Sequence, residues 1–156
     1  MLTEICAYLR NYFLRDYYDP DRYIHHGTFT IADNHMQALS FLLPGQHYRV
    51  IGSVFNDGVW RYDPNNPPTM TDETFDGTIW AMSVPKDVLD LATEIAAWNE
   101  ANASALSGPY QSESMTSSGY SYTKASGGTA GNETVPYNWR NQFAARLKPY
   151  KRQSVL

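Results

Sequence analysis

The chain has 156 residues, of which 42% are hydrophobic and only 18% are charged, and its formal net charge at pH 7 is -4. This length suits one domain with its own hydrophobic core, and the single cysteine excludes an intrachain disulfide. Aromatic residues make up 14% of the chain, with Tyr the most frequent, which suits either a Tyr-rich core or a surface that contacts other proteins.

The first predicted element is a helix over about residues 2–15, because apolar side chains recur there at helical spacing. They are Leu2, Ile5, Cys6, Leu9 and Phe13. Glu4 and Arg10 interrupt the segment and no long apolar run follows, so we expect neither a signal peptide nor a membrane span. Cys6 lies on the apolar stripe, where burial keeps a thiol protonated and inert, so it is predicted to belong to the core rather than act as a nucleophile.

A small antiparallel β-sheet is predicted to follow. Phe29 and Ile31 should face the core from a short strand, and Pro44-Gly45 should form a turn. The segment HYRVIGSVF meets Asn-Asp-Gly and resumes as VWRY, which predicts a hairpin that turns at residues 56–58, because Asp-Gly supplies the positive φ of a tight turn. The segment GTIWAMSV, residues 77–84, is typical of a further strand that leads into a helix.

The C-terminal half completes a predicted α+β fold. A long central helix is expected over about 85–103, where an apolar face includes Val88, Leu91, Ala92, Ile95 and Trp98. Residues 104–135, called the arm here, are rich in Ser, Gly, Thr and Tyr and are predicted to form a mobile, extended segment that orders on a partner. A C-terminal helix over about 138–148 should begin at Asn138 and end at Pro149, and a basic tail over 149–156 should follow it. We expect a single domain over 1–156.

No residue pattern indicates catalysis or a cofactor. The four histidines are irregularly spaced, which favours exposed loop residues over a zinc site: His25, His26, His35 and His47. The acids Asp72, Glu73 and Asp76 are predicted to lie ionised in a solvated loop rather than form a catalytic pair or a calcium site. The chain contains neither a GxSxG nucleophile motif nor a phosphate-binding P-loop motif. We therefore expect a protein that is not an enzyme.

Basic residues gather near the C-terminus, and no acid follows Glu133. They are Arg140, Arg146, Lys148, Lys151 and Arg152. A solvated helix end that complements the helix dipole is the simplest interpretation. Contact with an acidic surface of a neighbouring molecule, or sequence-independent contact with nucleic acid, are the alternatives.

Several stretches, taken in chain order, resemble a known family. VIGSVFNDGVWRY is followed by TMTDETFDGTIWAMSVP, by a predicted helix ending AAWNE, by PYQSESMTSSGYSYTKASGG and by WRNQFAARLKPYKR. This order is similar to that of the small head-tail connector, or neck adaptor, proteins of tailed bacteriophages and prophages. The resemblance covers nearly the whole chain and contains no catalytic motif.

The resemblance implies a structural virion protein that forms a homo-oligomeric ring, usually a dodecamer, beneath the portal protein. Such a ring extends the channel through which DNA passes without sequence readout, and it receives stopper or tail proteins in the neck. It needs neither a cofactor nor a membrane, and it is made in the host bacterial cytoplasm. The alternatives are another neck or tail component, such as a stopper or tail terminator, or a small ligand-binding or hydrolytic β-domain.

The residues predicted to form the assembly interface lie in the arm and the basic C-terminal segment. They combine tyrosines with cations, which suit contacts to a neighbouring copy or to the portal. The residues are Tyr110, Tyr120, Tyr122, Lys124, Arg146, Lys148, Tyr150, Lys151 and Arg152.

Overall fold

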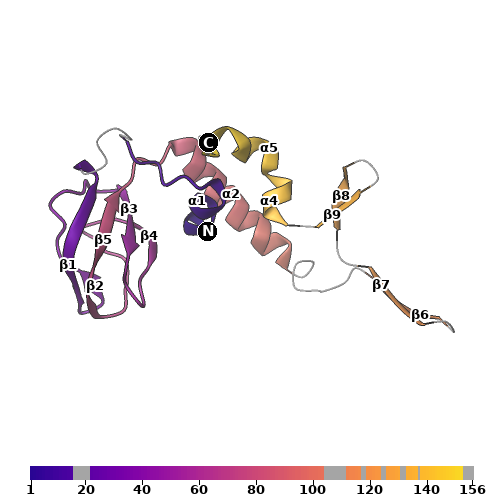
Figure 1. Cartoon of the computed structure of the whole chain (residues 1–156), viewed down its shortest axis with the longest axis horizontal. Helices are drawn as coiled ribbons and strands as arrows, with labels where there is room; N and C mark the ends of the chain where they lie inside the picture. The colour runs from indigo at the N-terminus through magenta and orange to yellow at the C-terminus, as the bar shows by residue number, and fades with distance from the viewer. Residues whose placement is uncertain are drawn as a thin grey trace. The chain divides into compact units, whose positions relative to one another are not determined.

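A computed structural model describes most of the chain. The described ranges are 1–15, 22–103, 112–116, 119–123, 126–130, 133–136 and 138–152. They belong to two compact units, Leu2–Lys86 and Asp87–Leu156, the latter joined by Met1 (Figure 1). The predicted α+β class is confirmed, since helices accompany an antiparallel five-stranded sheet. The single domain expected over 1–156 stays a prediction.

The N-terminal helix α1 spans Leu2–Leu9, so it ends well before the predicted boundary near residue 15. Arg10 adopts the left-handed conformation, with φ of 52°, and the amides of Arg10 and Asn11 return to carbonyls of the last turn at 3.1 Å each. This Schellman arrangement closes the helix. Phe13, which continued the predicted apolar stripe, is still buried, but from a turned segment in which its own φ is 51°.

The sheet of the first unit has the strand order β2-β1-β5-β3-β4, and each neighbouring pair is antiparallel. The strands are β1 Ile24–Ala32, β2 His35–Met36, β3 His47–Ile51, β4 Gly58–Arg61 and β5 Glu73–Ala81. β1 and β5 pair along most of their length, from Ile24 opposite Trp80 to Ile31 opposite Glu73. β5 is therefore the central strand, with a partner on each side.

Two turns of the sheet have the residues that their backbones require. At the predicted Pro44-Gly45 turn, a backbone hydrogen bond of 2.9 Å closes a turn in which Gly45 has φ of 83°, the type II geometry. β1 and β2 are joined through Asp33 and Asn34, with φ of 53° and 65°. Positive φ at both central residues is the type I′ geometry of tight hairpins. This second turn was not predicted from the sequence.

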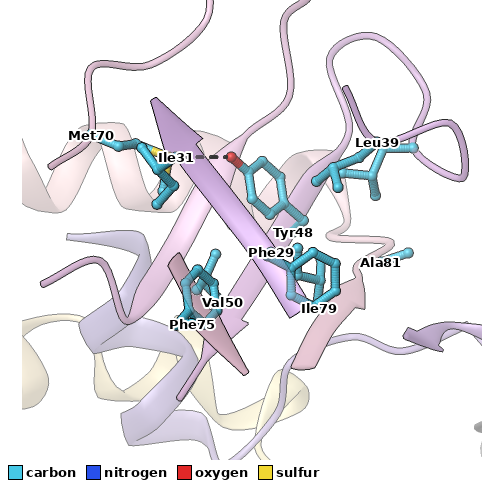
Figure 2. Close-up of a cluster of buried hydrophobic side chains, with 10 residues drawn as sticks. Phe29, Ile31, Leu39, Tyr48, Val50, Met70, Phe75, Ile79 and Ala81 are labelled. Atoms are coloured by element: carbon cyan, nitrogen blue, oxygen red, sulfur yellow. Dashed lines mark hydrogen bonds between the residues drawn. The ribbon is translucent and has the colours of Figure 1, made fainter. Parts of the chain in front are cut away.

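A cluster of buried side chains forms the core of the first unit (Figure 2). Tyr48 lies among aliphatic and aromatic groups, and its hydroxyl donates to the sulfur of Met70 at 3.9 Å. Burial raises the pKa of Tyr48 to about 12, so the hydroxyl remains a donor. Phe29 and Ile31 face this core as predicted. The cluster comprises Phe29, Ile31, Leu39, Leu42, Tyr48, Val50, Met70, Phe75, Ile79 and Ala81.

The helix α2, Lys86–Ala101, belongs to the second unit except for its first residue, and the sequence predicted a helix over about 85–103. Its buried residues, Val88, Leu91 and Ile95, follow the predicted apolar face. The helix includes the acids Asp87 and Glu94, whose contacts with the C-terminal segment are described below.

The C-terminal helix is divided, whereas the sequence predicted one helix over about 138–148. The pieces are α4 Trp139–Gln142, α5 Ala144–Leu147 and the 3-10 helix η2 Lys148–Tyr150. Phe143 separates α4 from α5 because its φ and ψ, -104° and 9°, depart from helical values. The predicted cap is confirmed, since the side chain of Asn138 accepts from the amide of Asn141 at 3.1 Å. Pro149 lies within η2 rather than ending an α-helix.

Within the arm, for which the sequence predicted a mobile and extended segment, the described backbone forms short paired strands. The strands are β6 Ser112–Thr116, β7 Gly119–Thr123, β8 Ser126–Ala130 and β9 Glu133–Pro136. β6 pairs with β7 and β8 pairs with β9, both antiparallel. The Tyr and Thr content, which favours strands, outweighs the lack of aliphatic residues. The rest of the arm, including 104–111, lies outside the described residues, and its mobility stays a prediction.

Candidate assembly interface

The connection between β3 and β4, residues 52–57, presents large apolar side chains to solvent. Val54 is 80% exposed and Phe55 is 66% exposed, and we call this pair the tip. The predicted hairpin is confirmed, but the predicted tight turn at 56–58 is not, because β3 ends at Ile51. Gly52, with φ of 93°, turns the chain out of the strand, and the loop continues to Gly58.

Glu73, the first residue of β5, is hydrogen-bonded to the loop. Its carboxylate accepts hydrogen bonds from the Ser53 hydroxyl and, at 2.9 Å, from the Val54 amide. Longer contacts of 3.4 Å and 3.3 Å come from the amide of Phe55 and the side-chain amide of Asn56. The Ser53 hydroxyl, followed by the backbone amides, lowers the pKa of the Glu73 carboxyl, so it stays ionised. Glu73 thus lies on a strand and not in the predicted solvated loop.

Asn56 satisfies the interior of the loop and is only 2% exposed. Its backbone amide donates to the Ser53 hydroxyl at 2.7 Å. Its side chain pairs with the backbone of Thr71 in both directions, accepting at 2.8 Å and donating at 2.9 Å. Its carbonyl accepts from the indole of Trp60 at 2.9 Å. Because buried polar groups are stable only when hydrogen-bonded, this set of bonds fixes one loop conformation.

The end of the sheet that carries the tip is acidic. Asp33 lies in the β1–β2 turn, Asp57 in the loop and Asp72 immediately before β5, and together with Glu73 they form what we call the acidic end. Asp57 accepts from a loop amide at 3.3 Å, and Asp72 accepts from an amide of the β1–β2 turn at 2.7 Å. These three segments contain no Lys or Arg. The loop that carries the tip and the segments at the same end of the sheet therefore contain carboxylates without a cation among them.

Only some of the predicted interface residues can be placed. Tyr110 and Lys124 lie outside the described residues. Tyr120 and Tyr122 lie on β7, in register with β6. The remaining members belong to the C-terminal segment, and four of them are exposed: Arg146, Lys148, Lys151 and Arg152.

Arg146 and Tyr150 make contacts inside the second unit. Arg146 forms a two-point ion pair with Glu94 of α2, with one N–O distance of 3.0 Å. The Tyr150 hydroxyl lies 3.3 Å from a carboxylate oxygen of Asp87, to which it donates. The predicted interface thus includes two residues that fasten the C-terminal helices to α2.

Cys6 is buried as predicted, and burial raises its pKa to about 11. The histidines were predicted to lie in loops, but all four lie in strands β1, β2 and β3. His25 stacks on Phe41 at 3.7 Å between ring centroids, and the Nδ1 atom of His26 lies 2.9 Å from the Thr78 hydroxyl. Within the described ranges, no group of three or more His, Cys, Asp or Glu residues could hold a metal ion.

Comparison of this chain with protein-family models, with curated proteins and with solved structures finds no match. Among the helices that the structure describes, none is long and apolar enough to cross a membrane.

Sequence reasoning missed the tip and its support. Val54 and Phe55 were assigned to a strand because they continue a β-branched and aromatic run. The available signal was Gly52, since a glycine inside a strand pattern often marks a departure from regular pairing. The partnership of Glu73 with Ser53 and Asn56 has no local signal, because it joins residues that are distant in the sequence.

Proposed function

We propose that this protein is a head-tail connector of a tailed bacteriophage, a structural component of the virion neck. It assembles as a ring of identical copies beneath the portal protein, extends the DNA channel and provides the attachment surface for stopper or tail proteins. It is made in the host bacterial cytoplasm, works without a cofactor and catalyses no reaction.

The observation that carries this proposal is the exposed tip, whose loop is held in place by the hydrogen bonds of Glu73 and Asn56. Small-molecule sites are concave, whereas Val54 and Phe55 project from the surface. Exposed apolar and aromatic groups of this kind are typical anchors of protein interfaces. Glu73 and Asn56 hold them in one conformation before any partner arrives. A projecting and pre-ordered apolar element suits a protein whose work is to join other proteins.

Two further features support an assembly role. The chain order resembles that of connector proteins over nearly its whole length, as the sequence analysis describes. The β6–β7 and β8–β9 ladders each contain two strands, and in the described part of the chain no third strand joins either of them. Isolated two-stranded hairpins are marginally stable in water, so contact with a portal or a neighbouring copy would stabilise both.

The test is to measure the mass of the purified protein alone and after mixing with its cognate portal protein. The proposal expects a portal complex whose mass rises by that of a ring, with the portal's twelvefold symmetry in electron microscopy. Replacing the tip by Val54→Ser and Phe55→Ser should weaken this assembly, while the matched control Leu43→Ser should not, because Leu43 is equally exposed (71%) but lies outside the tip. Failure of the wild-type protein to bind the portal would refute the connector assignment. A ring of another symmetry would indicate a different neck or tail component.

A further inference from the structure

The tip is ready to bind without a rearrangement. Binding by a loose loop is weakened by the conformational entropy lost when the loop becomes ordered. Here the Val54 amide is bonded to Glu73, and the side chain and backbone of Asn56 are bonded within the same unit. The apolar side chains of Val54 and Phe55 are thus exposed because the polar atoms below them are satisfied, and not because the loop lacks structure.

The charge around the tip restricts its partner. Asp33, Asp57 and Asp72 join Glu73 at the acidic end, and no cation occurs in the same segments. A partner surface with positive charge is favoured there, because opposite charges attract and facing like charges oppose association. The partner therefore combines an apolar contact for Phe55 with surrounding Lys or Arg residues.

The C-terminal segment of this same chain has that chemistry. No acid follows Glu133, and the described part of the segment, residues 138–152, presents exposed cations: Arg140, Lys148, Lys151 and Arg152, together with Arg146, which is paired with Glu94. Trp139 and Phe143 are buried, whereas Tyr150 of the same segment is only half-buried. A second copy thus offers positive charge beside a partly exposed aromatic side chain, the two features that suit the tip.

We propose that the tip and acidic end of one copy dock on the basic C-terminal segment, residues 138–152, of a second copy. The two patches differ, so the contact is heterologous, and its repetition produces a closed ring or an open chain of copies. The inference rests on the proposed function in one respect, since it names the surfaces by which neighbouring copies of the connector ring meet.

Site-directed cross-linking tests the contact. Phe55→Cys and Lys148→Cys are made as separate variants, mixed at high protein concentration and treated with a short bis-maleimide. A portion of the mixture also receives the cognate portal protein, so that assembly on a template is included. The expected result is a covalent heterodimer that forms only when both variants are present, with a yield that falls as salt screens the charges. A chain that carries both cysteines should form a ladder of multimers.

The chain supplies its own controls. Cys6 is buried with a raised pKa, so the wild-type protein should remain unlinked. Leu43→Cys mixed with Lys148→Cys should also remain unlinked, because Leu43 is exposed but lies outside the tip. Circular dichroism melts of each variant establish that it folds, which the exposure of the substituted side chains favours.

Three results would overturn the contact. The first is absence of the heterodimer both with and without portal. The second is a homodimer of the Phe55→Cys variant alone, which means a symmetric contact. The third is a double variant that loses both thiols without a gain in mass beyond the linker, which means contact within one chain. Portal binding without the heterodimer would leave the proposed function intact while rejecting this interface, so the two failures are distinguishable.

Discussion

The two ends of strand β5 belong to different kinds of structure, an apolar core and a hydrogen-bonded polar cluster. Toward its C-terminal end, Ile79 and Ala81 contribute to the apolar core around Tyr48, where burial of hydrocarbon holds the sheet together (Figure 2). At its N-terminal end, Glu73 and Asn56 form a hydrogen-bonded cluster that supports an exposed loop. The difference indicates that the core stabilises the unit as a whole, whereas the polar cluster determines the conformation of one surface element.

The largest effect on stability is expected in the apolar core. Ile79 is 0% exposed, and Ile79→Ala should lower the free energy of unfolding by about 2 to 5 kcal/mol, because it removes buried methyl groups and leaves a cavity. Urea unfolding followed by circular dichroism measures the change. A loss below about 0.5 kcal/mol, the range typical of surface substitutions, would contradict the assignment of Ile79 to the core.

A smaller effect is expected in the polar cluster. Asn56→Ala leaves the amide and carbonyl of Thr71 without their partner and should cost about 1 to 3 kcal/mol in the same urea experiment. It should also increase hydrogen exchange in residues 52–57, while Ile79→Ala should raise exchange throughout the unit. If Asn56→Ala were as damaging as Ile79→Ala and unfolded the whole sheet, the polar cluster would be part of the core and the comparison would fail.

The same contrast explains which parts of the fold were predictable. Burial of Phe29 and Ile31 follows from alternation within one strand, and the Pro44-Gly45 turn and the Asn138 cap follow from local residue chemistry. Each of these signals is local.

The features that the sequence did not predict depend on distant residues or on a competing local conformation. Helix α1 ends at Leu9 because Arg10 adopts a left-handed conformation, although the apolar periodicity continues to Phe13. Within the candidate site, the backbone of Val54 and Phe55 is hydrogen-bonded to Glu73, a partner that periodicity does not identify. Tertiary contacts here override a pattern that locally favours a strand.

The polar cluster is also expected to respond to acid. The folded state lowers the pKa of Glu73 from its ordinary value of 4.5, so its contribution is complete above that value and is lost as pH falls through the lower, folded pKa. Acidification below about pH 4.5 should therefore lower the hydrogen-exchange protection of residues 52–57, measured relative to the intrinsic exchange rate at each pH, because protonated Glu73 accepts fewer bonds. Glu73→Gln should show fast loop exchange already at neutral pH and a weaker acid dependence. An unchanged acid response in Glu73→Gln would assign the effect to another carboxylate.

The smallest effect on stability is expected at the tip, although it is the surface on which both proposals depend. Phe55 is 66% exposed, so Phe55→Ser removes little buried area and should change the free energy of unfolding by no more than about 0.5 kcal/mol. The same substitution should reduce association with neighbouring copies, because the docked ring would be buried there. Urea unfolding and sedimentation velocity on one preparation measure both quantities. If Phe55→Ser destabilised the monomer as much as Asn56→Ala does, Phe55 would serve the fold, and the exposed tip would no longer be evidence for assembly.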